Sequence, residues 1–450
     1  MGARIHSLEA AYRWLDEHIN YERRLESVAY TERAFQVGEF ARRLEHLGSP
    51  QRGLRTVHLA GTRGKGSAAL LLEGLMRQCG LRTAVFTSPH LREYRERIRI
   101  DGEPIRPSDF TELMSRIAEV SESLGTRERS FRTVFENLTA LFFLAARRHG
   151  VDWAIIETGL GGRLDSTNII EPGPVLLTRI SLEHTHLLGE TVEAIATEKA
   201  AILKRGGWAV VGSQDASGGA REVFERRAAQ EGTALTMAEA VCPLYGIWCH
   251  REGMVVQIGW AGRRLDLAVA LFGSFQAENI QNALAMYRRL VDECMVPELT
   301  DAQIGRAVAG VTLDGRMERV CRRPEVFADG GHCPAAARAV AKTMEEHFGG
   351  EPAVLVLGMM REKQHEGFMR ELARWPGWHA VGCYRAPTQR AADPARLARM
   401  ADRFWRRVTI YTDLQELLQS ELIGAEKSTR VVATGSFYSV AQLQEWGRRR

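Results

Sequence analysis

The sequence predicts an α/β fold in which two domains are each built on a largely parallel β-sheet. Short apolar segments alternate with helical segments from residue 57 to residue 212, and a second alternation runs from residue 325 to residue 434. This pattern is typical of parallel strands joined by right-handed helical crossovers. A chain of 450 residues is also long for a single hydrophobic core, so we expect at least two domains.

The first fifty residues are expected to form helices that cover the first sheet. Apolar side chains recur there at helical spacing in two stripes, and Gly48-Ser49-Pro50 ends the second one. The stripes comprise Leu8, Ala11, Tyr12, Leu15 and Ile19, and then Phe35, Phe40, Leu44 and Leu47.

A glycine-rich turn follows the first predicted strand. The apolar run 57–60 leads into residues 61–67, which read Gly-Thr-Arg-Gly-Lys-Gly-Ser, and a helical pattern begins directly afterwards. Glycines let backbone N–H groups approach an anion, and a helix N-terminus adds a favourable partial charge. The functional interpretation is a phosphate loop with Lys65 on the distal phosphates and Ser67 on Mg²⁺, although one residue separates the two, unlike the usual spacing. The alternative is an ordinary strand–turn–helix.

Four further strands are predicted to complete the first sheet. They are residues 82–88, 151–158, 175–181 and 208–212, with helices over 107–124, 133–149 and 191–205 and a small hairpin at 98–105. Ligands bind beyond the carboxyl ends of the strands in such sheets. Because Ser88, Glu157 and His184 lie at or just after strand ends, we expect them on the same edge as the glycine turn.

The pattern changes after about residue 235. Alternating segments at 254–258 and 264–269 flank a turn at 260–262, which predicts a small antiparallel region. Helices are predicted over 276–291 and 300–310, followed by strands at 325–329, 353–357, 378–384, 407–412 and 430–434. We therefore expect a first domain over residues 1–296, a linker over 297–316 and a smaller α/β domain over 317–450.

Composition argues against several classes of protein. Basic residues exceed acidic ones by four (60 against 56), too small and scattered an excess to indicate nucleic acid or a membrane surface as partner. Seven cysteines occur without a C-x-x-C pair, which favours reduced thiols in a cytoplasmic protein over disulfides or a zinc site. No apolar run approaches transmembrane length, and the N-terminus has no signal-like apolar core.

Three polar residues of the first domain are candidate metal contacts. Glu136 lies in the first turn of its helix, where complementation of the helix dipole is the alternative role. Glu157 ends an apolar strand, where the alternative is a surface carboxylate. His184 follows a strand, but a lone histidine is more often structural or exposed than a ligand.

Lys199 falls on the predicted buried stripe of its helix. A charge at such a position is costly unless it is paired or used. The functional interpretation is a lysine directed at the active edge, including one modified to a carbamate that would be an anionic metal partner. The alternative is a side chain that reaches out to solvent.

Two turns of the second domain also connect a strand to a helix. One is Asp329-Gly330-Gly331-His332-Cys333-Pro334, and the other is Gly435-Ser436. Both positions suit ligand contacts. His332 could instead cap the helix, and Cys333 is interpreted as a small packed residue because no activating base adjoins it in sequence.

Together these motifs resemble folylpolyglutamate synthase/dihydrofolate synthase, a member of the Mur ligase superfamily. The matching motifs follow one another in order over nearly the whole chain. They are residues 61–67, 87–91, 96–98, 135–136, 159–168, 184–185, 198–200, 278–279, 315–316 with Glu318, 329–332 and 435–436.

The resemblance implies an N-terminal P-loop ATPase domain and a C-terminal Rossmann-like domain, with ATP and the substrates between them, in a monomer. It implies that Ser67 and Glu136 bind one Mg²⁺, that His184 binds a second, and that Lys199 is the lysine which the family carbamylates. Implied ATP contacts are Gly61, Thr62, Arg63, Gly64, Lys65, Gly66, Ser67, Asn279, Arg316 and Asp329. Implied substrate contacts are Thr87, Ser88, Pro89 and His90 on the pterin side, and His332 and Ser436 near glutamate.

The implied reaction adds L-glutamate to a folate-type carboxylate, either dihydropteroate or tetrahydrofolate. The carboxylate attacks the γ-phosphate of ATP to form an acyl phosphate, and the α-amino group of glutamate then forms the amide, releasing ADP and phosphate. Lys65 and Mg²⁺ would neutralise the charge that develops in the phosphoryl step.

Several positions depart from the family pattern, more of them on the substrate side than among the ATP and metal positions. Arg63 replaces Asn, Tyr94-Arg95 replace Phe-Asn, Glu183 replaces Asp, Gly331 and Cys333 replace Ala and Asn, and residues 361–364 replace a Lys-Asp-Lys-Asp run. Two alternatives follow. One is a ligase that joins glutamate, or another amine, to a different acid, and the other is a relative that binds nucleotide without ligation.

Overall fold

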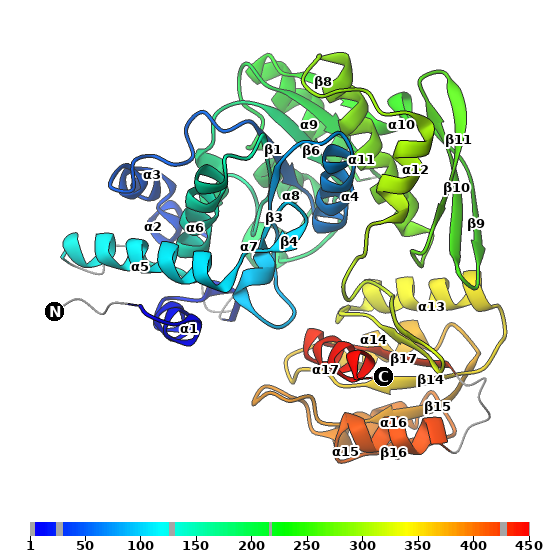
Figure 1. The fold of residues 1–450 in the computed structure, drawn as a ribbon. Helices are drawn as coiled ribbons and strands as arrows, with labels where there is room; N and C mark the ends of the chain where they lie inside the picture. The colour runs from blue at the N-terminus through cyan, green and yellow to red at the C-terminus, as the bar shows by residue number, and fades with distance from the viewer. Residues whose placement is uncertain (1–4, 24–29, 126–130, 216–217, 424–429, 450) are drawn as a thin grey trace. The chain divides into compact units, whose positions relative to one another are not determined.

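The computed structural model describes residues 5–23, 30–125, 131–215, 218–423 and 430–449 (Figure 1). By their contacts these residues form two compact units. The first unit lies within residues 1–245, 258–265 and 278–311, and the second within 246–257, 266–277 and 312–450. This division differs from the boundaries expected from the sequence in that it assigns residues 246–257 and 266–277 to the second unit.

An eight-stranded sheet in the order β4-β3-β2-β5-β1-β6-β7-β8 forms the first unit. Strands β2, β5, β1, β6, β7 and β8 run parallel, whereas β3 pairs antiparallel with β2 and with β4. The strands are β1 (Thr56–Ala60), β2 (Thr83–Phe86), β3 (Ile98–Ile100), β4 (Glu103–Pro104), β5 (Trp153–Glu157), β6 (Pro174–Leu177), β7 (Trp208–Val211) and β8 (Ala234–Met237).

Strand β8 was not predicted from the sequence. It is a four-residue edge strand whose side chains are exposed or half-buried. An edge strand of this kind lacks the continuous apolar run by which buried parallel strands are recognised.

Helices cover both faces of this sheet. Alternate strand residues, including Phe86, Ile156 and Leu177, pack into clusters with α6 or α8 and α9, while α4 contacts β1, β2 and β5. The helices are α1 (Leu8–Asp16), α2 (Glu32–Phe35), α3 (Val37–Glu45), α4 (Lys65–Gln78), α5 (Pro107–Ser123), α6 (Val134–His149), α7 (Thr185–Leu188), α8 (Val192–Ala200), α9 (Ala220–Glu231), α10 (Ala238–Val241) and α12 (Asp301–Ala309), with short 3-10 turns at Tyr21–Arg23, Tyr94–Arg97 and Ser166–Ile169.

A three-stranded antiparallel ribbon and a long helix follow. The ribbon has the order β11-β10-β9 and comprises β9 (Leu244–His250), β10 (Gly253–Trp260) and β11 (Arg263–Val269), and the helix is α11 (Phe275–Asp292). The sequence predicted β10 and β11 but not β9. The residues of β9 read Leu-Tyr-Gly-Ile-Trp-Cys-His, in which apolar residues do not alternate with polar ones. Tyr245 and Trp248 on this edge strand are exposed.

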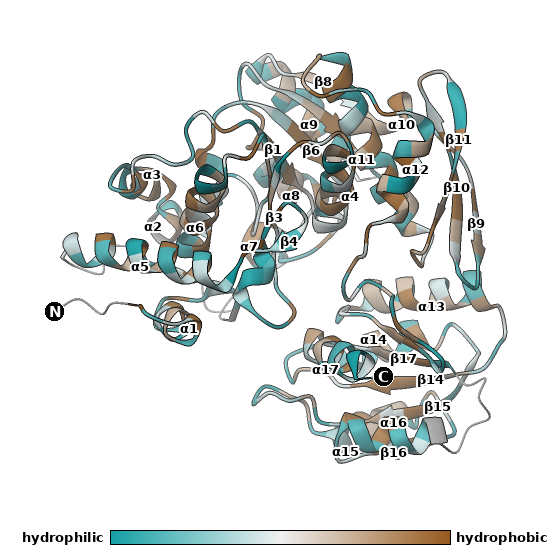
Figure 2. Cartoon of the chain, in the orientation of Figure 1, coloured by the Kyte–Doolittle hydropathy of each residue, from teal (hydrophilic) through white to brown (hydrophobic). Residues whose placement is uncertain are grey.

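The second unit contains a six-stranded sheet in the order β12-β13-β17-β14-β15-β16. All its strands run parallel except β12, which pairs antiparallel with β13 and was not predicted. Figure 2 shows apolar residues along β14 and β17, which are buried throughout. The elements are β12 (Glu318–Arg322), β13 (Glu325–Ala328), α13 (Pro334–Phe348), β14 (Ala353–Leu357), α14 (His365–Leu372), β15 (Trp378–Cys383), α15 (Pro394–Ala401), β16 (Val408–Ile410), α16 (Leu414–Ile423), β17 (Arg430–Thr434) and α17 (Phe437–Arg448).

Within the described ranges, no helix combines the length and the apolar character that crossing a bilayer requires.

The core of the first unit predicts a stability effect. Leu141 of α6 is fully buried, so Leu141→Ala should lower the free energy of unfolding by about 2–5 kcal/mol through lost burial and a residual cavity. Leu182→Ala is the control, because Leu182 is 56% exposed and its loss should cost under about 0.5 kcal/mol. Denaturant unfolding measures both, and equal costs would contradict this description of the core.

Candidate active site

The glycine turn connects β1 to α4 at the carboxyl edge of the first sheet. Gly64 caps α4 in the left-handed conformation, with φ of 84°, and a Cβ on it would lie 2.2 Å from Asn279 Oδ1. A Cβ on Gly61 would lie 1.8 Å from Thr178 Oγ1. Both positions therefore require glycine, and the turn leaves the N-terminus of α4 open to an anion.

Lys65 and Glu157 form the central charged pair of this edge. Lys65 Nζ donates to Gly61 O at 2.9 Å and lies 3.6 Å from Glu157 Oε1. The backbone N–H of Ser88 donates to Glu157 Oε2 at 3.1 Å, and a Cβ on Gly66 would lie 3.2 Å from the same oxygen. The buried carboxylate of Glu157 therefore faces the glycine turn.

Glu136 lies in a different setting. Its Oε2 accepts hydrogen bonds from the backbone N–H groups of Arg132 and Thr133, and Thr133 Oγ1 accepts from Glu136 N in return, which is a capping box at the start of α6. Glu136 Oε1 lies 3.5 Å from Arg43 Nη1. Both carboxylate oxygens are thus used in a structural role, and the helix-terminal alternative accounts for this residue.

Lys199 is buried on α8 with only 5% of its surface exposed. The Gly159–Asp165 turn packs against it closely, since a Cβ on Gly162 would lie 3.0 Å from Lys199 Cα. Asp165 holds that turn by accepting from the backbone N–H groups of Gly159 and Leu160, each at 2.9 Å. Burial, and then the neighbouring charge of Lys65, lowers the pKa of Lys199 to about 7.

His184 lies at the start of α7 in a left-handed conformation, with φ of 50°. Burial lowers its pKa; Glu183 opposes this shift, and Lys199 and Lys65 add to it. Because these charges act on the same imidazole, the carboxyl edge gathers His184 with Lys65 and Lys199. A largely neutral imidazole at this edge is suited to act as a ligand or a hydrogen-bonding group.

The predicted pterin-side residues follow β2. Thr87 N donates to Arg97 O at 3.0 Å, Ser88 and His90 are half-buried, and Pro89 is exposed. Arg97 Nε donates to His90 Nδ1 at 2.8 Å, and the buried guanidinium of Arg97 forms two hydrogen bonds to Glu22, at 2.7 and 2.6 Å.

Two departures from the family pattern have partners in the same region. Tyr94 donates its hydroxyl to Asp16 at 2.8 Å, and Arg95 Nη1 donates to Ile105 O at 2.9 Å. Both side chains therefore tie the Tyr94–Arg97 turn to its surroundings.

The second unit gathers a separate set of predicted residues around Phe437. The Arg316 guanidinium lies over the Phe437 ring at 5.3 Å, and the His332 ring lies edge-on to it at 6.2 Å. A Cβ on Gly330 would lie 2.2 Å from a ring carbon of Phe437. Phe437 was not identified from the sequence, since an aromatic residue at a helix start carries no functional signal by itself.

Asp329 and Ser436 organise the backbone of that set. Asp329 accepts hydrogen bonds from Met317 N at 3.0 Å and from Gly331 N at 2.8 Å, and burial raises its pKa while Arg316 opposes the shift. Ser436 Oγ caps α17 by accepting from Tyr438 N at 3.1 Å. His332 Nδ1 lies 3.2 Å from Gly330 O, so a donating Nδ1–H would leave Nε2 as an acceptor.

Cys249, Glu346 and His347 are the one group in the described residues whose ligand atoms lie close enough to suggest a metal site. His347 Nε2 accepts from Gly273 N at 2.9 Å, and Nδ1 lies 2.9 Å from His250 O. Glu346 accepts from Ser274 N at 3.1 Å. Because these bonds occupy both imidazole nitrogens, the group serves to hold residues 250, 273 and 274 on α13.

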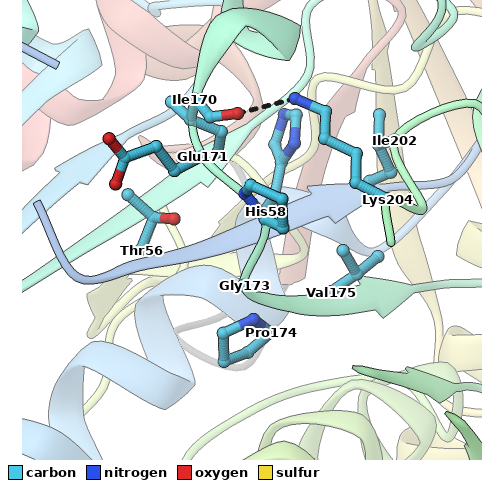
Figure 3. Close-up of a pocket in the computed structure, with 10 residues that line it drawn as sticks. Thr56, His58, Ile170, Glu171, Gly173, Pro174, Val175, Ile202 and Lys204 are labelled. Carbon is cyan, nitrogen blue, oxygen red and sulfur yellow. Dashed lines mark hydrogen bonds between the residues drawn. The ribbon is translucent and has the colours of Figure 1, made fainter. Parts of the chain in front are cut away.

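A small cavity of about 10 Å³, large enough for about one water molecule, lies beside His58 and Lys204 (Figure 3). It adjoins Thr56 and Pro174, the first residues of β1 and β6, and so lies at the opposite edge of the sheet from the glycine turn. Burial, and then the charge of Lys204, lowers the pKa of His58 to about 3. Lys204 Nζ donates to Asn168 O and Ile170 O, at 2.7 and 2.6 Å. These groups are structural.

The chain matches a known family model and is similar in sequence to known proteins. A model described as the Mur ligase, glutamate ligase domain matches residues 315–437. A dihydrofolate synthase/folylpolyglutamate synthase of Mycobacterium tuberculosis is 32% identical over 79% of this chain and 75% of its own length. A folylpolyglutamate synthase of Lacticaseibacillus casei is 32% identical over 72% of this chain and 75% of its own length.

The chain is also similar to a longer relative and to a solved structure. The chain matches about half (48%) of a probable bifunctional folylpolyglutamate synthase/dihydropteroate synthase of Haloferax volcanii, at 32% identity over 90% of this chain. The structure of Mycobacterium tuberculosis folylpolyglutamate synthase complexed with ADP and AMPPCP aligns with a TM-score of 0.83 and 28% identity, covering 98% of each chain.

The low pKa of Lys199 predicts how stability depends on pH. Below pH 7 the lysine is protonated in both the folded and the unfolded protein, so the cost of burying its charge is present in full. Between pH 7 and 10.5 the unfolded protein binds more protons, and stability rises with pH by at most about 1.4 kcal/mol per pH unit from this group. Lys199→Met should therefore stabilise the protein most below pH 7, with a gain that shrinks at higher pH.

Thermal unfolding of both proteins between pH 6 and pH 9, in buffer free of CO₂, measures this difference. A gain from Lys199→Met that stays constant over the range would contradict the lowered pKa.

Proposed function

Because this chain belongs to the folylpolyglutamate synthase/dihydrofolate synthase family of the Mur ligase superfamily, we propose that it is an ATP-dependent ligase that adds L-glutamate to a folate-type carboxylate. The observation that carries the proposal is the Lys65–Glu157 pair at a glycine turn that opens onto a helix N-terminus. A solved complex of a folylpolyglutamate synthase with AMPPCP and folate, which aligns with 98% of the chain at a TM-score of 0.81, also supports it.

The glycine turn is the proposed site of the ATP phosphates. Residues 64–67, at the start of α4, would direct backbone N–H groups at the phosphate oxygens, since the N–H groups of Thr62 and Arg63 donate to Arg179 O. Lys65 would offset the charge that develops on the γ-phosphate, and its contact with Glu157 keeps the ammonium at the turn before nucleotide binds. Asn279, which borders Gly64, would line the same nucleotide site.

The residues at this edge fit Mg²⁺, with one change from the set expected on resemblance. Mg²⁺ binds few carboxylates together with phosphate oxygens. Glu157 offers a buried carboxylate beside the turn, whereas the oxygens of Glu136 are used in the helix cap and the Arg43 pair. We therefore propose Ser67 and Glu157 as ligands of one ion, and His184 as a ligand of a second. When bound, the ion would supply positive charge at the phosphate.

Lys199 is proposed to carry a carbamate. A neutral amine forms a carbamate by attacking CO₂, with formation of an N–C bond and release of a proton, and a pKa of about 7 leaves much of this amine neutral. The anionic product would relieve the like-charge contact between Lys199 and Lys65 and would interact favourably with a cation at this edge.

The two chemical steps need the substrates to be held away from water. The acid carboxylate attacks the γ-phosphorus and ADP leaves; the glutamate nitrogen then attacks the acyl carbon and phosphate leaves. We propose that residues 87–90 contact the acid, that His332 and Ser436 contact glutamate, and that Arg316 and Asp329 contact ATP. Positioning of this kind can contribute roughly 7–11 kcal/mol.

The proposal includes a monomer in the cytoplasm. All seven cysteines are free thiols, as expected in a reducing compartment. Tyr94 and Arg95, two departures from the family pattern, both form hydrogen bonds within the protein. Because Cys333 stands where the family pattern has Asn, substrate tests should include other acids.

The ligase proposal predicts that ADP release requires an acid and glutamate together. With dihydropteroate or tetrahydrofolate, omission of glutamate should abolish turnover in a coupled ADP assay. Lys65→Ala should abolish it with all substrates present, because the loop would lose its only lysine, whereas Lys342→Ala, which removes an exposed lysine paired with Glu346, should not. Turnover only with another acid would overturn the folate assignment, and ATP binding without glutamate-dependent release would overturn ligation.

Glutamine substitutions distinguish the two carboxylates. Glu157→Gln should raise the Mg²⁺ concentration needed for half-maximal rate at least tenfold, because an amide is a poor ligand for this ion. Glu136→Gln keeps an acceptor oxygen for the capping box, but should lower stability because it removes the charge that faces the buried guanidinium of Arg43, and it should leave the Mg²⁺ dependence within twofold. Rates titrated with Mg²⁺ and thermal unfolding measure the two effects, and the reverse pattern would restore Glu136 as the ligand.

A further inference from the structure

We propose that Arg179 and Glu278 form a clamp that holds the glycine turn in the shape needed for nucleotide. Arg179 would act on the start of the turn through its backbone, and on the end of the turn through Glu278 and Asn279. Neither Arg179 nor Glu278 is proposed to touch the phosphates, so both are positioning residues. The inference rests on the proposed function only in that the turn binds a nucleotide.

The backbone of Arg179 supports the first half of the turn. Its carbonyl oxygen accepts from both Thr62 N, at 3.0 Å, and Arg63 N, at 3.4 Å. The Thr62 hydroxyl extends the same contact, since it donates to Ser181 O and accepts from Ser181 N, each at 3.1 Å. The path of residues 61–63 is therefore set by the segment that follows β6.

That segment is itself braced from the next strand. Gln214, which follows β7, accepts from Ile180 N at 3.0 Å and donates to Thr178 O at 3.3 Å. Because the backbone is held on both sides of Arg179, a displacement of that residue would also displace the turn.

The side chain of Arg179 reaches the start of α11. Its Nε donates to Glu278 Oε2 at 3.0 Å and its Nη2 to Glu278 Oε1 at 2.9 Å, while Nη1 bonds to Asp215. This two-bond geometry fixes the orientation of the carboxylate as well as its distance, which a lysine could not do.

Glu278 thereby places Asn279 against the second half of the turn. The two residues are adjacent in the first turns of α11, and Asn279 Oδ1 fills the space beside Gly64 where a Cβ would lie 2.2 Å away. A shift of α11 would therefore open or close the turn at the residue that caps α4 and precedes Lys65.

A partly exposed ion pair is by itself a weak source of stability. About one third of each side chain is exposed here, 32% for Arg179 and 36% for Glu278. The clamp is therefore expected to affect the geometry of the turn, and so nucleotide affinity, more than the stability of the fold. Because nucleotide affinity and stability are expected to respond differently, the clamp can be tested.

The test measures affinity for AMPPCP with Mg²⁺ by calorimetry, using the full chain. Arg179→Lys keeps the charge but loses the two-bond geometry, and Glu278→Gln keeps the shape but loses the charge. Each should weaken binding roughly 3- to 10-fold, and the double variant should weaken it no more than either alone, because the pair acts as one unit. Hydrogen exchange of residues 61–66 should become faster in all three.

Matched controls lie on α9. Arg221 and Glu225 form an exposed pair at 2.9 Å, so Arg221→Lys and Glu225→Gln make the same chemical changes away from the turn. They should leave AMPPCP affinity and exchange at residues 61–66 unchanged, and KM for the acid should stay within twofold in the clamp variants. Wild-type affinity in Arg179→Lys and Glu278→Gln, or a loss matched by the controls, would overturn the clamp.

The two proposals fail in different ways. Nucleotide binding that weakens as expected in a protein without glutamate-dependent ADP release would sustain the clamp and overturn ligation. Intact ligation with unchanged AMPPCP affinity in both variants would do the reverse.

Discussion

The candidate site of the first unit is organised around a lysine ammonium that lies beside a buried carboxylate at a helix N-terminus. Lys65 and Glu157 lie 3.6 Å apart, and the glycines around them leave no room for a side chain. Glu157 ends β5, and Lys65 begins α4 just after β1; because β1 and β5 are adjacent and parallel, the glycine turn after β1 lies beside the end of β5. A site that receives a polyanion needs positive charge, and the Lys65 ammonium and the N-terminus of α4 provide it before any ligand arrives.

The partners of each buried charged group then distinguish the two carboxylates of this region. Glu136 and Glu157 are both buried carboxylates, but Glu136 spends its oxygens on a helix cap and Arg43. Glu157 faces the turn instead. Lys199 shares its surroundings with Lys65, and burial together with that like charge brings the pKa of Lys199 to about 7. Proximity of two cations in a buried setting favours a neutral amine, and hence the carbamate that we propose.

In the second unit, an aromatic ring packs against the residues expected at the site. Phe437 contacts Arg316 and His332 and fills the space over Gly330. Asp329 links the backbone of residues 317 and 331, so the residues expected to meet ATP and glutamate are held by one small core.

The sequence alone determined the α/β class, most strands of both sheets, the glycine turn and the family. These follow from local signals, since buried parallel strands are continuous apolar runs and glycine turns have a fixed pattern. It did not reveal the edge strands β8, β9 and β12, whose half-exposed residues lack such runs, nor Phe437 and the Arg179–Glu278 pair. Only the tertiary structure distinguished the surroundings of Glu157 from those of Glu136, because Arg43, which pairs with Glu136, and Lys65 and Ser88, which contact Glu157, come from segments far from these carboxylates in the chain.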